Sequence, residues 1–302
     1  MIKLNESEKL NNTSVCIGNF DGLHIAHKAL IDMANKEKGE LKSVIYTFSP
    51  HPRKLFGKEH FSIQSDKEKE ESLTEMGCDY LYIKETTMEF LSKSPEEFVK
   101  EELFSRLGAK KVFVGYDFKF GKNSGGDATL LSALGEKYGF SVTVLPEIKE
   151  KDVPVKSSII RGFIEEGDFE KAALFLGRLH SYEGEVVHCK GLGKNLGFPT
   201  ANIFPEEDKA LPPFGVYAVK ANVNGKIYDA VANVGLNPTV EHGDKPKIEI
   251  HLIDFNEDIY GKRIKISFFK IIRREKKFAN IDELKYQIEK DVKKAKKCLT
   301  NC

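Results

Sequence analysis

The sequence has little that would build a metal site or a disulfide framework. Its 302 residues include five cysteines, at positions 16, 78, 189, 298 and 302, and no two of them form a C-x-x-C pair. An odd number at unrelated spacings argues against a disulfide framework and indicates free thiols. The same spacings argue against a metal site built on cysteine.

Long apolar runs and a strong charge of one sign are absent as well. No apolar run reaches the length of about 18 residues that a membrane span needs. The formal net charge of +1 does not predict binding to nucleic acid or to a membrane surface. The opening "MIKLNESEKLNN" contains no hydrophobic signal region, so we expect a cytoplasmic protein with no nucleic-acid and no membrane partner.

The first half of the chain alternates apolar strands with amphipathic helical segments. Apolar strands are predicted over residues 13–18, 43–48, 110–115 and 139–145. The best-marked helix covers residues 94–108, because Ser94 can cap it and Pro95 stands at its first position. This alternation predicts an α/β fold in which a parallel, Rossmann-like sheet carries helices on both faces.

In the second half, strands follow one another directly. Two alternating segments flank Asn224-Gly225, which is typical of a two-residue hairpin turn, and two further strands are predicted over 247–255 and 263–272. We expect a small antiparallel β-barrel that ends in a helix over 280–299. The chain therefore divides into two predicted domains, residues 1–181 and 182–302.

Two histidines, His24 and His27, follow the strand at 13–18 and a glycine turn, and they open a helix. Zinc binding is disfavoured, because the H-x-x-H pattern contains no glutamate and has no third ligand beside it. One packed and one solvated imidazole is the alternative that any such pair allows. At a helix start, however, backbone and imidazole N–H groups attract anions, and this favours a polyphosphate ligand.

The segment "GLGKNLGFPTAN" lacks the Gly-Lys-Ser/Thr end of a P-loop, so Walker-type binding is excluded. Thr200 and Asn202 stand two residues apart, and an extended chain would point both to one side, where a hydroxyl and an amide oxygen can hold Mg²⁺. Pro199 stiffens the approach, and Gly193 and Gly197 let the backbone come close to phosphate. An ordinary loop entering a strand would also explain the glycines and the proline.

The alternating strand "IEIHLID" separates an apolar face from a polar one. Glu249 and His251 share the polar face, opposite Ile248, Ile250 and Leu252. A solvent-exposed glutamate is the usual occupant of such a position. We interpret His251 as structural.

The stretch "GNFDGLHIAH" resembles the nucleotidyltransferase signature H-x-G-H, in the form found in bacterial bifunctional riboflavin kinase/FAD synthetases. Other segments resemble motifs of that family in the family's order: "FSPHPRKLF", "VGYDFKFGKNSGGD", "KSSIIRGFIEEGDFEKAALFLGR", "GFPTAN", "PPFGVYAV", "AVANVGLNPTV" and "IIRREKKFANIDEL". Several motifs in order over two domains are far more specific than any one of them. By this resemblance the chain is identified as a member of that family.

For domain 1–181 the resemblance implies FMN adenylyltransfer, in which the FMN phosphate attacks the α-phosphorus of ATP with the help of Mg²⁺. The implied residues are His24, His27, Ser157, Ser158 and Arg161 at the ATP phosphates, Gly18, Phe20 and Asp21 in the turn beneath the nucleotide, and Asp117 at the flavin side. Simpler roles are also open for three of them. Phe20 could belong to the core, Asp117 to a turn, and Arg161 to the charged surface.

For domain 182–302 the resemblance implies phosphorylation of riboflavin by ATP. Thr200 and Asn202 would bind Mg²⁺, and Glu249 would act as the base on the ribityl hydroxyl. Arg273 and Phe278 would contact the flavin. The implied partners are riboflavin, FMN and ATP, with transient delivery of flavin to flavoproteins.

Three residues depart from the family pattern in the first domain. Ala26 replaces a glycine between the histidines, Ser124 an arginine, and Ile159 a threonine. The added bulk, the lost cation and the lost hydroxyl would each weaken phosphate binding, since one donor lost to a charged group costs about 1.5–3 kcal/mol. A riboflavin kinase with a degenerate adenylyltransferase domain is therefore the first alternative, and a non-catalytic flavin-binding regulator or carrier is the second.

Overall fold

The structure is a computed structural model that describes residues 1–52, 55, 61–188, 197–236 and 246–300. The chain forms two compact units, Met1–Ser157 and Ser158–Cys302. Helix α7 (Phe169–Leu176) and nearly all of α6 (Ser157–Glu166) group with the second unit, and the domain boundary after residue 181 stays a prediction. None of the helices in the described ranges has the length and apolar character needed to cross a membrane.

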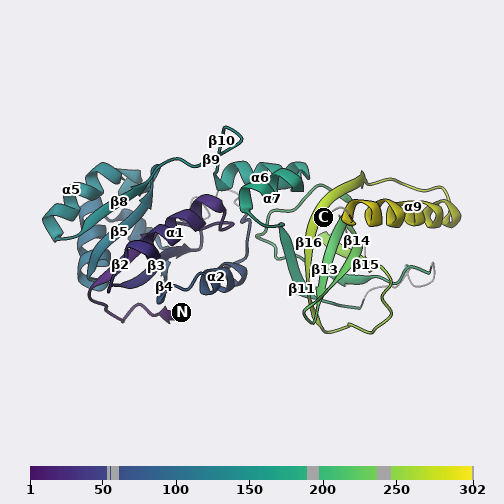
Figure 1. The fold of residues 1–302 in the computed structure, drawn as a ribbon, viewed down its shortest axis with the longest axis horizontal. Helices are drawn as coiled ribbons and strands as arrows, with labels where there is room; N and C mark the ends of the chain where they lie inside the picture. The colour runs from purple at the N-terminus through teal and green to yellow at the C-terminus, as the bar shows by residue number, and fades with distance from the viewer. Residues whose placement is uncertain (53–54, 56–60, 189–196, 237–245, 301–302) are drawn as a thin grey trace. The chain divides into compact units, whose positions relative to one another are not determined.

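The first unit contains a six-stranded sheet in the order β1-β4-β3-β2-β5-β8, and every neighbouring pair is parallel (Figure 1). Its strands are β1 (Ile2–Leu4), β2 (Thr13–Ile17), β3 (Lys42–Ser49), β4 (Tyr80–Glu85), β5 (Ala109–Gly115) and β8 (Ser141–Leu145). Its helices are α1 (Ile25–Glu37), α2 (Asp66–Glu75), α3 (Met88–Ser92), α4 (Pro95–Phe98), the π-helical η2 (Val99–Arg106) and α5 (Ala128–Tyr138). The short elements are β6 (Lys119–Phe120), η3 (Lys122–Ser124), β7 (Gly126–Asp127), β9 (Lys149–Glu150) and β10 (Val153–Pro154).

Two hydrophobic cores lie on opposite faces of this sheet, because successive strand residues point to opposite sides. Val15 and Val112 belong to the core that includes residues of η2 and α5. Their neighbours Cys16 and Phe113 belong to the core that includes residues of α1 and α2. The predicted parallel sheet with helices on both faces is therefore confirmed.

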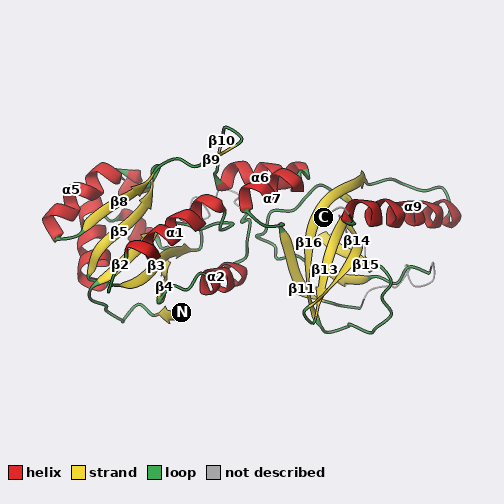
Figure 2. Ribbon diagram, viewed as in Figure 1, coloured by secondary structure: helices red, strands yellow, loops and turns green. Residues whose placement is uncertain are grey.

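The second unit is an antiparallel six-stranded sheet in the order β11-β16-β13-β14-β15-β12 (Figure 2). Its strands are β11 (Ser181–Glu185), β12 (Ala201–Ile203), β13 (Gly215–Val223), β14 (Lys226–Leu236), β15 (Pro246–Leu252) and β16 (Arg263–Arg274), and α9 (Ile281–Leu299) ends the unit. A bridge between Val187 and Asn202 joins the two edges of the sheet, so the barrel is nearly closed. Asn224 and Gly225 form the predicted hairpin turn, with φ angles of 52° and 84°.

Helix α9 covers the outer side of the barrel. Ala295 and Leu299 of the helix join Val216 and Ala218 of β13 in one buried cluster. A continuous apolar contact of this kind fixes the helix on the barrel. The predicted barrel with a terminal helix is thus confirmed.

Candidate functional site

The first group of predicted site residues lies at the carboxyl ends of two neighbouring strands. The chain leaves β2 for β3 on one side and later returns to β5 on the other side of β2. Ligands of parallel α/β sheets usually bind outside the strand ends at such a switch of direction. The turn that carries His24 follows β2 directly, and Asp117 follows β5 directly.

The turn after β2 has a constrained backbone. Phe20 and Leu23 adopt φ angles of 50° and 40°, a region that residues with side chains seldom occupy. Phe20 is fully buried, and a Cβ on Gly18 would come within 3.1 Å of its ring. The backbone N–H of Ile63 donates to Asp21 Oδ1 at 2.7 Å. Phe20 is therefore a core residue that also shapes the turn, and its contact with a nucleotide stays a prediction.

His24 and His27 form one compact unit at the start of α1. The backbone N–H of His27 donates to His24 Nδ1 at 3.2 Å, so His24 caps the helix with a ring nitrogen. Because Nδ1 accepts, the proton of the His24 imidazole is on Nε2, which can donate to a ligand. The two rings stack with centroids 3.5 Å apart.

The second imidazole of this pair is held uncharged. Burial, and then the neighbouring His24, lowers the pKa of His27 well below the usual 6.5. Its Nδ1 atom is buried, and no hydrogen-bond partner for it occurs among the described residues. A buried ring nitrogen without a partner at a helix N-terminus is an expected feature of an anion site that a ligand completes.

Asp117 belongs to a surface network beside this turn. Its carboxylate lies 3.2 Å from Lys156 Nζ, which also lies 5.1 Å from the centre of the Tyr116 ring. Hydrogen bonds to Tyr116 and then to Asp117 raise the pKa of Lys156. The next residue, Ser157, donates its hydroxyl to the Asp21 carbonyl at 2.9 Å, so the network reaches the histidine-bearing turn. Sequence reasoning missed Lys156, although it directly precedes the predicted Ser157.

The other predicted phosphate contacts of this group belong to the second unit. Ser158 is exposed and Arg161 is half-buried, both on α6. Their approach to the histidines stays a prediction.

Of the three residues that depart from the family pattern, Ala26 lies in the first turn of α1, and the histidine stack forms with alanine there. Ser124 is exposed and has a φ of 56°.

The second group of predicted site residues meets across two strands of the barrel. β12 and β15 pair so that Asn202 stands directly opposite Glu249. The Cβ atoms of such a pair are about 4.5–5.5 Å apart. Asn202 is 4% exposed, and its buried Oδ1 has no hydrogen-bond partner in the described part of the chain. A carboxamide oxygen in this condition suits a hard cation such as Mg²⁺.

Glu249 has a charged neighbour that sequence reasoning did not single out. Lys247 Nζ lies 2.5 Å from Glu249 Oε1, and the two side chains are 13% and 32% exposed. The signal was available, since the alternation that puts His251 beside Glu249 also puts Lys247 there.

The loop that leads into β12 is tied to β15. The Pro199 carbonyl oxygen lies 2.9 Å from His251 Nδ1, and Thr200 is half-buried just before the strand. Gly197 has a φ of 87°, which a residue with a side chain would resist. Gly193 lies outside the described residues.

The end of β16 and the segment after it carry the residues predicted to contact the flavin. Arg273 Nε donates to Asp291 Oδ2 of α9 at 2.9 Å, and the Arg273 guanidinium lies 5.6 Å from the Phe278 ring centre. Asp291 is 3% exposed, so this ion pair anchors the end of β16 to α9. The Glu275 carboxylate lies next to Gly235 of β14. A Cβ added to Gly235 would come within 2.8 Å of Glu275 Oε1. Flavin contacts of Arg273 and Phe278 stay predictions.

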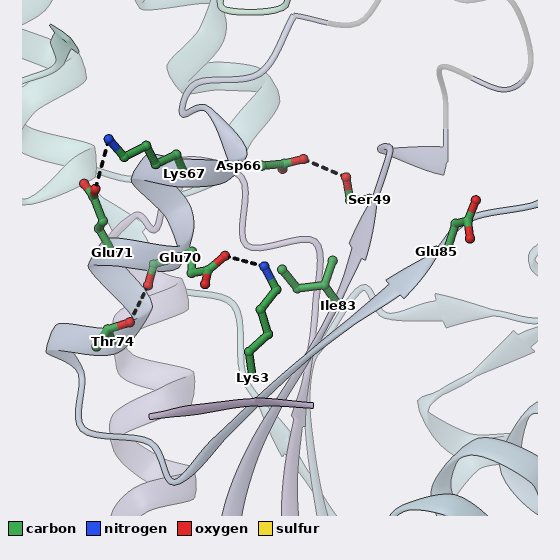
Figure 3. Close-up of a pocket in the computed structure, with 9 residues that line it drawn as sticks. All are labelled: Lys3, Ser49, Asp66, Lys67, Glu70, Glu71, Thr74, Ile83 and Glu85. Atoms are coloured by element: carbon green, nitrogen blue, oxygen red, sulfur yellow. Dashed lines mark hydrogen bonds and ion pairs between the residues drawn. The ribbon is translucent and has the colours of Figure 1, made fainter. Parts of the chain in front are cut away.

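A cavity of about 720 Å³ lies elsewhere in the first unit, beside α2 and strands β1, β3 and β4 (Figure 3). It is lined by Lys3, Ser49, Asp66, Lys67, Glu70, Glu71, Thr74, Ile83 and Glu85. The pairs Lys3–Glu70 and Lys67–Glu71 lie along its wall at 2.7 Å and 3.7 Å. None of the predicted site residues lines it, so we assign it no role in the chemistry.

Two family models match the chain and together cover both units. The FAD synthetase model matches residues 6–159, and the riboflavin kinase model matches residues 176–299. The bifunctional riboflavin kinase/FMN adenylyltransferase of Bacillus subtilis is 36% identical over 97% of this chain and 95% of its own length. The chain belongs to this family. The predicted family membership is therefore confirmed.

Other relatives agree with this family assignment. The bifunctional riboflavin kinase/FMN adenylyltransferase of Escherichia coli is 36% identical over 91% of this chain and 89% of its own length. A solved structure from Streptococcus pneumoniae, described as a macrolide-efflux protein, has a TM-score of 0.88 and 29% identity over 98% of both chains. Its two-unit fold is thus similar to that of this chain.

Proposed function

We propose that this family member makes FMN and FAD at two separate sites. In the barrel unit, the ribityl 5′-hydroxyl of riboflavin attacks the γ-phosphorus of ATP, and ADP leaves. In the α/β unit, an FMN phosphate oxygen attacks the α-phosphorus of a second ATP, and pyrophosphate leaves. The observation that carries the proposal is the pairing of the buried Asn202 carboxamide with Glu249 across β12 and β15.

At the kinase site, a hydroxyl must lose a proton as its oxygen bonds to phosphorus. Glu249 is the base, and its carboxylate on the polar face of β15 accepts that proton. Thr200 and Asn202 are the residues that would hold Mg²⁺, which neutralises phosphate charge when bound. We assign Gly193, Gly197 and Pro199 to phosphate binding, and Arg273 and Phe278 to flavin binding.

At the adenylyltransferase site, the protein mainly supplies positioning and positive electrostatic potential. The Nε2–H of His24 and the neutral ring of His27 bind the phosphates at the N-terminus of α1. Ser157, Ser158 and Arg161 bind them from α6. Gly18, Phe20 and Asp21 hold the turn, and Asp117 contacts the flavin nucleotide.

The described geometry favours two activities over a kinase with a degenerate first domain. The histidine stack and the helix cap both form with Ala26 in place. Matches to both family models also favour the bifunctional enzyme. Cytoplasmic location and transient delivery of flavin to flavoproteins are parts of the same proposal.

The test is product analysis by chromatography with the full chain, ATP and Mg²⁺. Riboflavin should yield FMN and then FAD, and FMN alone should yield FAD. Glu249→Gln should lose FMN formation and keep FAD formation from added FMN. If FMN yields no FAD, the protein is a riboflavin kinase without adenylyltransferase activity. If neither FMN nor FAD forms but riboflavin still binds, the result favours a flavin-binding regulator.

A further inference from the structure

Lys247 is the closest charged neighbour described for Glu249. Its Nζ lies 2.5 Å from Glu249 Oε1, so the two side chains form a close ion pair. Ile248 between them is fully buried, so the two flanking side chains share the opposite, polar face of β15. Only 13% of the Lys247 side chain is exposed, which restricts it far more than an ordinary surface lysine.

The strand register sets the neighbours of Lys247 and Glu249 on this face. Directly across from Lys247 on β14 stands Gly235, which has no side chain. The Glu275 carboxylate occupies the space above Gly235. Across from Glu249 stand two carboxamides, Asn202 on β12 and Asn233 on β14. Among the described residues on the polar face of β15, Lys247 thus provides the positive charge next to Glu249.

In this arrangement the two carboxylate oxygens of Glu249 can have different roles. An ammonium donates hydrogen bonds but cannot accept a proton, so it cannot itself replace the base. An ion pair at Oε1 restricts rotation of the carboxylate and leaves Oε2 to meet another donor. Because misplacement of a catalytic group by about 1 Å can cost about 100-fold in rate, such restriction matters for a base.

We propose that Lys247 is a positioning residue for riboflavin phosphorylation, and this rests on the proposed role of Glu249. Its ammonium holds Oε1, and Oε2 accepts the proton of the ribityl 5′-hydroxyl. As the hydroxyl oxygen bonds to the γ-phosphorus, the bond from that phosphorus to the bridging oxygen breaks and ADP leaves. The lysine keeps its proton and its charge throughout.

The first experiment separates kcat from KM in FMN formation by the full chain. Lys247→Met should lower kcat by about 10-fold or more, with the KM values for riboflavin and ATP changed by no more than about twofold. Lys247→Arg should recover part of the lost kcat, because it restores a donor and a charge. The control is Lys220→Met, which removes a half-buried lysine 3.7 Å from Asp229 and should leave both constants unchanged.

A double-mutant cycle tests whether Lys247 acts through Glu249. In a Glu249→Gln background, Lys247→Met should cause no further loss of kcat, because the group that it positions is already gone. Melting temperatures of all variants are measured, and Lys247→Gln serves in place of a methionine variant that fails to fold.

The outcomes are distinguishable. An unchanged kcat in Lys247→Met, with FMN formation lost in Glu249→Gln, overturns the positioning role and leaves the base assignment standing. Additive losses with a raised KM for ATP overturn it too, since the lysine would then act on the nucleotide. Normal FMN formation by Glu249→Gln overturns the base assignment itself, and the positioning role with it.

Discussion

His24 accepts a hydrogen bond from the backbone N–H of His27 through Nδ1 at 3.2 Å, so this imidazole caps α1, and the phosphate contact proposed for it falls to Nε2–H. These two tasks can be separated by substitution. An asparagine side chain caps a helix well but has no imidazole ring. An alanine side chain provides neither the cap nor the ring.

We therefore expect His24→Asn and His24→Ala to lose FAD formation from FMN to a similar extent. Only the alanine variant should also lose helix-cap stability, typically about 1 kcal/mol. Chromatography of the products and urea unfolding measure the two effects, and FMN formation from riboflavin serves as the internal control. Wild-type FAD formation by the asparagine variant would show that the ring is used for capping alone.

Stability should fall as the pH drops, because each unit contains a histidine whose pKa is lowered in the folded state. Burial lowers the pKa of His27 and of His180 well below 6.5, aided by His24 in the first case and by Lys209 and Arg178 in the second. The unfolded chain then binds these protons more readily, so the stabilisation is complete above the unfolded pKa and declines below it. Urea unfolding across that range should show a shallower pH dependence in His27→Gln. Identical slopes for variant and parent would contradict this account.

Element types could be predicted where local chemistry decides them. The strand predicted over 13–18 is observed as Thr13–Ile17, and the Asn224-Gly225 hairpin forms as expected. The strand predicted from residue 139 begins at Ser141, because Gly139 adopts a left-handed conformation and ends α5. The helix predicted over 94–108 continues as a π-helix from Val99, a change of hydrogen bonding that side-chain periodicity does not reveal.

The sequence could predict individual residues of the candidate site but not which of them contact one another. Alternation within β15 placed Glu249 on a polar face, yet its position opposite Asn202 depends on pairing between strands distant in the sequence. The contact of Lys247 with Glu249 needed a side-chain conformation as well. Likewise, the pattern suggested that His24 binds an anion, while its role as a helix cap emerged only from the backbone geometry.

Gly235 and Gly215 should respond differently to the same substitution. A Cβ on Gly235 would meet the Glu275 carboxylate at 2.8 Å, the mobile end of a side chain that can move away. A Cβ on Gly215 would meet the Arg273 backbone oxygen at 2.6 Å, which cannot move without shifting β16. Gly235→Ala should therefore keep its melting temperature within a few degrees, while Gly215→Ala should be destabilised by about 1–3 kcal/mol.

The activity of Gly235→Ala then reports on Glu275. Displacing this carboxylate from the polar face near Lys247 should raise the KM for riboflavin or lower kcat in FMN formation, with FAD formation from added FMN unchanged. Steady-state kinetics of both reactions provide the measurement. Full kinase activity in a correctly folded Gly235→Ala would mean that Glu275 has no part in the site.

Asn202 should make the barrel unit sensitive to Mg²⁺. Its buried Oδ1 has no hydrogen-bond partner among the described residues, so a cation that binds there stabilises the folded state by mass action. In the presence of a non-hydrolysable ATP analogue, added Mg²⁺ should raise the melting temperature of the parent, and Asn202→Ala should lose most of this response.

A second asparagine of the same sheet gives the matched control. Asn222 Oδ1 accepts from the backbone N–H of Gly225 in the β13–β14 hairpin, so Asn222→Ala weakens a turn without touching the site. Loss of a residue that merely supports a metal ligand costs about 10–100-fold in metal affinity, and loss of a ligand should cost no less. FMN formation should therefore need much more Mg²⁺ in Asn202→Ala and the usual amount in Asn222→Ala. Equal Mg²⁺ dependence in the two variants would exclude Asn202 as a ligand, because both lose a carboxamide and only one of the two faces Glu249.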